Sequence, residues 1–131
     1  MSQPEPLKTT HCLAFLYLTF AHQTDGELSD DERSVIRTKL QEWCGDDTSM
    51  SAVNDLINET IDWYNGEDHE KRVGLMAFIA SQLKDEGFSE TSRKAVLSDL
   101  ISIAKSDGQY DDLEREWAQL LAKEMEIEFS D

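Results

Sequence analysis

The apolar residues of this 131-residue chain recur with the period of an α-helix almost from end to end. Apolar side chains that are three, four and seven residues apart share one face of a helix, whereas a half-buried strand alternates apolar and polar residues. No segment of useful length alternates in that way. Because the links between the periodic segments are short, the pattern predicts an all-α fold, a single compact bundle of roughly six to seven helices. We expect one domain over residues 1–131, with residues 1–6 as a flexible tail.

Six segments carry the helical pattern, at residues 7–23, 29–45, 50–65, 68–86, from 90 onward and from 111 onward. Their ends are predicted from residues that cap helices. A serine side chain accepts a hydrogen bond from the first free N–H groups of a helix, so Ser49 and Ser89 are expected to precede helices. Gly87 is expected to end the fourth helix, because glycine adopts the left-handed conformation without strain.

The distribution of apolar residues predicts which helices are central. The first helix is apolar on most faces between residues 13 and 20, which is typical of a buried helix. We expect the fourth helix to be central as well, because Leu75, Phe78 and Ile79 widen its apolar stripe. The stripe expected on the last helix consists of Leu113, Trp117, Leu120 and Leu121.

The charge balance restricts the class of partner. The chain carries 12 Lys and Arg against 28 Asp and Glu, a net charge of −16. This balance argues against nucleic acid and against direct docking on anionic lipid, which both require a basic footprint, and it favours cations or proteins with a basic surface. The apolar run at residues 12–21 is shorter than the roughly 20 residues that cross a bilayer. We therefore expect a cytoplasmic chain with no membrane-inserted segment and with Cys12 and Cys44 reduced.

An acidic nine-residue turn occurs twice in the chain. Residues 25–33 read Asp-Gly-Glu-Leu-Ser-Asp-Asp-Glu-Arg, and residues 107–115 read Asp-Gly-Gln-Tyr-Asp-Asp-Leu-Glu-Arg. Asp-Gly, a capping residue and Glu-Arg fall at the same offsets, and each copy joins an apolar helix to an amphipathic one. The repetition predicts two equivalent helix–turn–helix units, but the spacing alone does not place the two turns side by side.

Helix capping explains part of the repeat. Ser29 and Asp111 are in position to cap the second helix of each unit, and Glu32 and Glu114 follow three residues later. A glutamate at that offset completes a capping box by accepting from the backbone N–H of the cap residue. On this interpretation the two turns are structural, although capping does not require the aspartate before each glycine.

Calcium-loop spacing offers a second interpretation. In an EF-hand loop the glycine is the sixth residue and a bidentate glutamate is the twelfth. Both turns keep that spacing and have aspartate at the fifth position, but the first and third positions do not match, so each turn is half a site. Two half-sites that face each other would hold a divalent cation, with Ca²⁺ expected first and Mg²⁺ or Mn²⁺ next. The candidate ligands are Asp25, Glu32, Asp107 and Glu114, with Glu27, Ser29 and Asp111 as weaker ones.

Enzymatic chemistry is not predicted. The chain has no glycine-rich phosphate loop and no H-E-x-x-H motif. A nucleophilic pair of Cys12 with His11 or His22 is disfavoured, because Cys12 opens an apolar run and adjacent helical residues point to different faces. The alternative to a cation-binding domain is a metal-independent acidic interaction module, with Trp63 and Tyr64 open to docking.

The repeated turn resembles that of the tellurite-resistance TerB-like family, whose members are all-α bundles with two helix–turn units. The resemblance rests on Asp25-Gly26 with Glu32, on Asp107-Gly108 with Glu114, and on the apolar helix before each unit. Related domains occur in membrane-anchored co-chaperones. The resemblance implies an acidic patch that binds a divalent metal, usually calcium, and a non-enzymatic adaptor role in stress response. It also implies protein partners near the inner face of a membrane.

Overall fold

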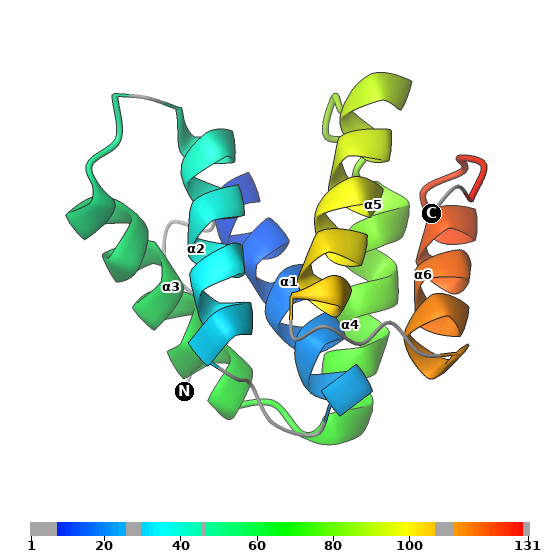
Figure 1. Cartoon of the computed structure of the whole chain (residues 1–131), viewed down its shortest axis with the longest axis horizontal. Helices are drawn as coiled ribbons and strands as arrows, with labels where there is room; N and C mark the ends of the chain where they lie inside the picture. Colours follow the sequence, from blue (N-terminus) through cyan, green and yellow to red (C-terminus); the bar gives the residue numbers. More distant parts are fainter. Residues whose placement is uncertain (1–7, 26–29, 46, 107–111, 130–131) are drawn as a thin grey trace.

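Six α-helices make up the secondary structure of the residues that the computed structural model describes, and those residues form no strand. The described ranges are 8–25, 30–45, 47–106 and 112–129, and the description excludes the side chains of residues 23–25. In Figure 1 the helices are α1 (Thr9–Asp25), α2 (Asp30–Cys44), α3 (Met50–Asn65), α4 (His69–Gln82), α5 (Glu90–Lys105) and α6 (Asp112–Glu124). The predicted all-α bundle is confirmed. The N-terminal segment 1–6 lies outside the described residues.

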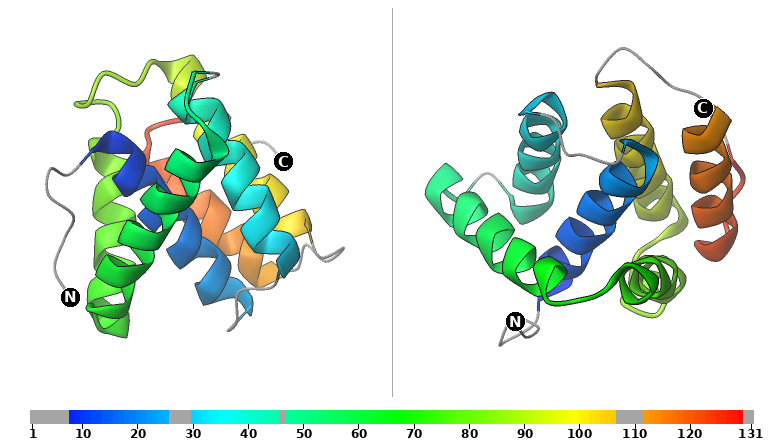
Figure 2. Two further views of the ribbon diagram at one scale, coloured as in Figure 1. Left: turned by 90° about the vertical axis from the view of Figure 1, so that its left-hand side faces the viewer. Right: turned by 90° about the horizontal axis from the view of Figure 1, so that it is seen from below.

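α1 is the centre of the bundle. It packs against α2, α3, α4, α5 and α6, and Figure 2 shows it between α3 on one side and α5 on the other. Every side chain from Leu13 to Ala21 is buried, with at most 4% of its surface exposed. The Thr19 hydroxyl is tolerated there because it donates to the Phe15 carbonyl, with 2.7 Å between the oxygens. The buried, central first helix is confirmed.

The aromatic end of α3 belongs to the core. Trp63 and Tyr64 are 3% and 9% exposed, so the expectation that they are open to docking is wrong. Their rings pack on Phe15 of α1, with centroid distances of 4.2 and 5.6 Å. The guanidinium of Arg72 lies 4.0 Å from the Tyr64 ring centroid and shields that ring. The end of α3 is therefore fixed against the central helix.

α4 lies at the margin of the bundle rather than at its centre. It packs against α1 and α6, and Phe78 is 59% exposed on its outer side. The expectation is therefore wrong for Phe78, whereas Ile79 is buried and Leu75 packs partly buried against the core. The helix ends at Gln82, earlier than expected, and a turn follows in which the Phe88 N–H donates to the Leu83 carbonyl over 3.0 Å. Gly87 closes this turn with φ +93°, the left-handed role predicted for it.

α6 is rotated relative to the predicted stripe. Leu113 and Leu120 are 46% and 44% exposed, although both were expected in the core. The buried face of the helix and of the turn after it consists of Glu114, Ala118, Leu121, Ala122 and Met125. Two of these residues are alanines, and α6 packs against α5, α4 and α1. Leu113 and Leu120 are left on the outer side.

Two serine caps define the starts of helices as predicted. Ser49 accepts from the Ala52 N–H and Ser89 accepts from the Ser92 N–H, each over 3.1 Å. Each such cap contributes about 1 kcal/mol. The expected caps Ser29 and Asp111 lie outside the described residues.

Candidate metal site

The helices that flank the two acidic turns meet at one end of the bundle. In Figure 1 the end of α1, the start of α2, the end of α5 and the start of α6 all lie in the lower half of the view. The start of α2 and the end of α5 line a common groove, formed by Asp31, Ser34, Val35, Ser102, Lys105 and Ser106. α1 also packs against both α5 and α6. The two units that the repeat identifies are thus neighbours in space.

The glutamate of each acidic turn is buried. Glu32 and Glu114 are both 1% exposed, while the residues on either side of each are exposed. Both occupy the third position of their helix, α2 and α6 respectively. The free N–H groups and the dipole at a helix N-terminus favour a carboxylate there. Capping requires only a contact with the backbone, whereas the enclosure of both side chains is a further property that the units share.

The other candidate ligands are described only in part. Asp25 is the last residue of α1, and its side chain is outside the description. Glu27, Ser29, Asp107 and Asp111 lie outside the described residues altogether. Within the described ranges, no three or more His, Cys, Asp or Glu side chains are grouped to hold a metal ion. The two enclosed carboxylates are hard oxygen donors of the kind that Ca²⁺ and Mg²⁺ prefer, so the donor chemistry fits the cation that the repeat predicts.

The histidines near the first unit have other partners. The His22 Nδ1 atom hydrogen-bonds the Tyr64 hydroxyl, and its ring meets the Tyr64 ring edge-on. His11 is buried, its Nδ1 accepts from the Lys8 backbone N–H over 3.1 Å, and its Nε2 lies 2.8 Å from Glu59 Oε1. Because Nδ1 accepts, Nε2 carries the proton that is donated to the carboxylate.

Both thiols are held in the protonated form. Burial raises the pKa of Cys12, and the negative charge of Glu86 raises it further. Burial also raises the pKa of Cys44, which packs against the core. A thiolate is the reactive form of cysteine, so neither environment activates the sulfur as a nucleophile.

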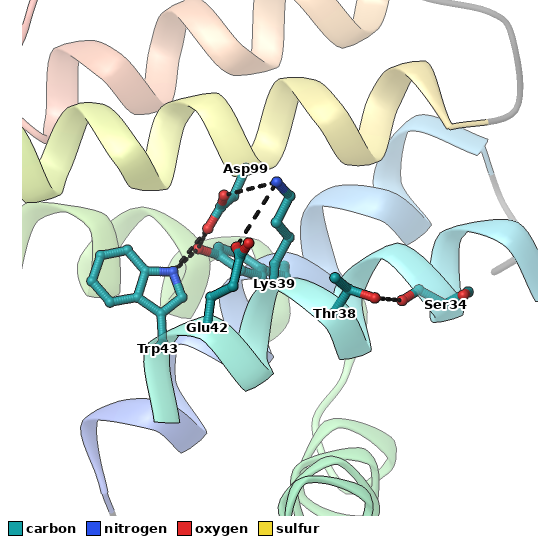
Figure 3. Close-up of polar contacts among 7 residues, drawn as sticks. Ser34, Thr38, Lys39, Glu42, Trp43 and Asp99 are labelled. Atoms are coloured by element: carbon teal, nitrogen blue, oxygen red, sulfur yellow. Dashed lines mark hydrogen bonds and ion pairs between the residues drawn. The ribbon is translucent and has the colours of Figure 1, made fainter. Parts of the chain in front are cut away.

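A buried carboxylate joins three helices elsewhere in the bundle. Asp99 of α5 is 7% exposed, and its Oδ2 accepts from the Tyr17 hydroxyl at 2.6 Å and from Trp43 Nε1 at 2.8 Å. Figure 3 shows Asp99 with Trp43 and with Lys39, whose Nζ lies 3.7 Å from Asp99 Oδ1. Burial raises the pKa of Asp99, against the opposing effect of its hydrogen bonds and of Lys39. Burial and the negative charge of Asp99 raise the pKa of Tyr17 well above its ordinary value.

Sequence reasoning missed this network. The available signal was an aspartate within the apolar pattern of α5, next to Leu100 and between Leu97 and Ile101. Its partners are 82 and 56 residues away in the chain, and no local spacing links them. The position of the carboxylate was open to prediction, but its hydrogen-bond donors were not.

Comparison with known proteins adds one match. The family model of the tellurite resistance protein TerB matches residues 12–131, which covers nearly all of α1 and everything after it. Searches of curated proteins and of solved structures gave no match. In the part of the chain that the structure describes, every helix is too short or too polar to cross a bilayer.

Proposed function

The chain belongs to the TerB family of tellurite resistance proteins, and from that premise we propose that it is a non-enzymatic adaptor of the stress-response type that binds a divalent cation. The proposed ligands are Asp25, Glu32, Asp107 and Glu114, with Glu27, Ser29 and Asp111 as weaker ones. Ca²⁺ is the first candidate, followed by Mg²⁺ and Mn²⁺. The proposed location is the cytoplasm, with recruitment to the inner membrane through protein partners.

The enclosure of both motif glutamates is the observation that carries this proposal. Glu32 and Glu114 are each 1% exposed, at the end of the bundle where the two units are neighbours. In a chain of net charge −16, carboxylates gathered at one end raise the energy of the folded state. A bound divalent cation would supply positive charge there and lower that energy.

The non-enzymatic part of the proposal rests on the candidate nucleophiles. Burial raises the pKa of the Cys12 and Cys44 thiols, which suppresses the thiolate. His11 and His22 are committed to Glu59 and Tyr64 respectively. The acidic end of the bundle is suited to holding a cation and to meeting a basic protein surface.

Thermal unfolding tests the proposal. The protein is treated with a chelator, desalted and titrated with Ca²⁺, Mg²⁺, Mn²⁺ or Zn²⁺ at constant ionic strength. An ion at a hundred times its Kd should stabilise the fold by about 2.7 kcal/mol, which is about 10 °C for a domain of this size. Glu32→Gln and Glu114→Gln should each reduce the shift. The matched control is Glu90→Gln, which also alters the first turn of a helix, at the opposite end of α5.

Two outcomes of the thermal unfolding experiment would contradict the cation proposal. If no ion shifts the midpoint selectively up to millimolar concentration, or if Glu90→Gln reduces the shift as much as Glu32→Gln does, the cation proposal fails. The repeat would then be a pair of helix caps.

A metal-independent interaction module is the second candidate, and the outer side of α6 favours it. Leu113 and Leu120 are exposed and Trp117 is half-buried, and helical spacing puts Glu116 and Glu124 on the same side. An apolar strip with glutamates along it suits a partner that is basic and partly apolar. Such binding should weaken with monovalent salt and ignore chelation, whereas cation-dependent binding should respond to chelation at constant ionic strength.

A further inference from the structure

A groove between α2 and α3 brings together polar side chains that the proposed adaptor function does not use. Arg33 and Arg37 of α2 face it from one side and Asn54 and Asn58 of α3 from the other, and its volume is about 260 Å³. Ile57 and Ile61 of α3, both half-buried, contribute to its apolar surface. We refer to this feature as the α2–α3 groove.

The spacing of these residues explains how four polar side chains reach one groove. The arginines are four residues apart on α2, and the asparagines are four residues apart on α3. Residues at that spacing share a face of a helix, and α2 and α3 pack against each other. The isoleucines follow the asparagines on the same face of α3. The groove therefore combines two cations and two amides with an aliphatic surface.

These four polar side chains have no bonding partner within the described part of the protein. There, the side chains of Arg33 and Arg37 make no ion pair and no hydrogen bond, and neither do those of Asn54 and Asn58. Lys39, on the same helix, does contact carboxylates at Glu42 and Asp99. Arg33 and Arg37 are both exposed. In a chain with 28 acidic residues against 12 basic ones, neither arginine has a carboxylate partner among the described residues, so both guanidinium groups are available to an anion from outside.

We propose that the α2–α3 groove binds a small organic monocarboxylate that carries an aliphatic group. The planar guanidinium matches a carboxylate through two parallel hydrogen bonds. Asn54 and Asn58 can donate to and accept from an amide or hydroxyl of the same ligand. The aliphatic part lies against Ile57 and Ile61. A single negative charge is favoured because the net charge of −16 repels a multiply charged anion more strongly.

An NMR titration tests this assignment with N-acetylleucine as the probe. It carries a carboxylate, an amide and a branched aliphatic group, and N-acetylleucinamide is the matched neutral control. The protein is metal-stripped and freed of chelator, so the result does not depend on the cation proposal. Saturable shifts of the backbone amides are expected at the groove residues of α2 and α3. N-acetylleucinamide and inorganic phosphate should bind at least about ten-fold more weakly, because each lacks one of the two recognised features.

Variants identify the groups responsible. Arg33→Gln/Arg37→Gln should raise the Kd by at least about ten-fold. Arg33→Lys/Arg37→Lys keeps both charges and loses the planar fork, so it should bind with intermediate affinity. Lys84→Gln, an exposed cation on the turn after α4, makes the same charge change as one Arg→Gln substitution and should bind like the unaltered protein. Spectra outside the groove report that each variant is folded.

Three outcomes would overturn the proposal. The first is equal binding of N-acetylleucine and N-acetylleucinamide, which would remove the role of the carboxylate. The second is unchanged binding in the Arg33→Gln/Arg37→Gln variant, which would remove the groove. The third is binding of inorganic phosphate as tight as that of N-acetylleucine, which would replace the ligand class with a simple oxyanion.

Discussion

Substitution of Asp99 separates the cost of burying its charge from the value of its hydrogen bonds. Asp99→Asn keeps a carbonyl oxygen that can accept from Tyr17 and Trp43, and it removes the negative charge. Asp99→Ala removes the acceptor as well. In the protein, Tyr17 is fully buried and donates to Asp99 Oδ2 at 2.6 Å, while Trp43 Nε1 also lies 3.0 Å from the Tyr17 hydroxyl oxygen.

The magnitude for Asp99→Ala follows from that geometry. Trp43 keeps an acceptor in the Tyr17 oxygen, so one buried donor, the Tyr17 hydroxyl, loses its partner. A buried donor without a partner costs about 1–3 kcal/mol, and the ion pair with the partly exposed Lys39 adds little. For a domain of this size about 1 kcal/mol corresponds to roughly 4 °C. The midpoint of Asp99→Ala should therefore fall by roughly 4–12 °C at pH 7, and that of Asp99→Asn by much less.

The pH dependence provides the sharper test. Burial raises the pKa of Asp99 above its usual 3.8, Glu42 raises it further, and Tyr17, Trp43 and Lys39 oppose the rise. The folded state therefore holds this proton more tightly than the unfolded state does. The stability that this tighter proton binding gives the folded protein is complete below the unfolded-state pKa of Asp99. It is lost as pH rises through the folded-state pKa. Because asparagine does not titrate, Asp99→Asn should gain on the unaltered protein over that window, by about 1.4 kcal/mol for each unit of the pKa difference.

Urea unfolding followed by circular dichroism, at intervals from pH 4 to pH 7.5, measures this difference. Asp55→Asn is the matched control, since it removes one exposed carboxylate from α3 and corrects for the change in net charge. If Asp99→Asn loses stability relative to the unaltered protein as pH rises, the folded-state pKa is lowered rather than raised. The hydrogen bonds and Lys39 would then outweigh burial, and the reasoning above would be refuted.

Two further predictions concern the end of α6. Glu126 has φ +58°, a left-handed conformation that costs a side-chain-bearing residue about 1 kcal/mol. Glu126→Gly should therefore raise the thermal midpoint by a few degrees. A lower midpoint would show that the Glu126 side chain makes a stabilising contact. Arg93 is 8% exposed and donates from Nη1 to the Met125 carbonyl over 2.6 Å. Arg93→Met should cost about 2 kcal/mol in urea unfolding, and an unchanged free energy of unfolding would mean that this charge-assisted bond adds nothing net.

The helices and their ends could be predicted because their signals are local. The caps Ser49 and Ser89 and the left-handed Gly87 act on backbone groups within a few residues. The apolar run of the first helix identified the centre of the bundle for a similar reason, since a helix without a polar face has to be covered on all sides.

The rotation of α6 could not be predicted in this way. Its buried face includes Glu114, Ala118 and Ala122, a carboxylate and two small residues that contribute little to an apolar pattern. The larger Leu113 and Leu120 belong to a more apolar stripe, yet they lie outside, and Leu121 and Met125 supply the large apolar side chains of the buried face. Which face of a helix is buried thus depends on the shape of the neighbouring helices, and that information is not local.

The same distinction between local and non-local information applies to the two proposed sites. The acidic repeat identified Glu32 and Glu114 from the sequence, because equivalent residues at equal offsets are visible without any fold. The α2–α3 groove depends on the packing of two helices. Its arginine pair and its asparagine pair, each spaced i, i+4, form a common groove only because α3 lies beside α2. Arg33 was noticed only as the last residue of the acidic repeat, with no binding role, and Arg37 lies outside the repeat.

The first turn of α2 belongs to both proposed sites. Glu32 is enclosed at the end of the bundle, whereas Arg33, the next residue, is exposed and faces the α2–α3 groove. Adjacent residues on a helix point in directions about 100° apart, so one turn presents an acidic group to one site and a basic group to the other. A ligand that restrains this turn from either side reduces the ordering that the second ligand has to impose. Coupling between two binding sites is reciprocal, so the same free energy would connect cation affinity at Glu32 with carboxylate affinity at Arg33.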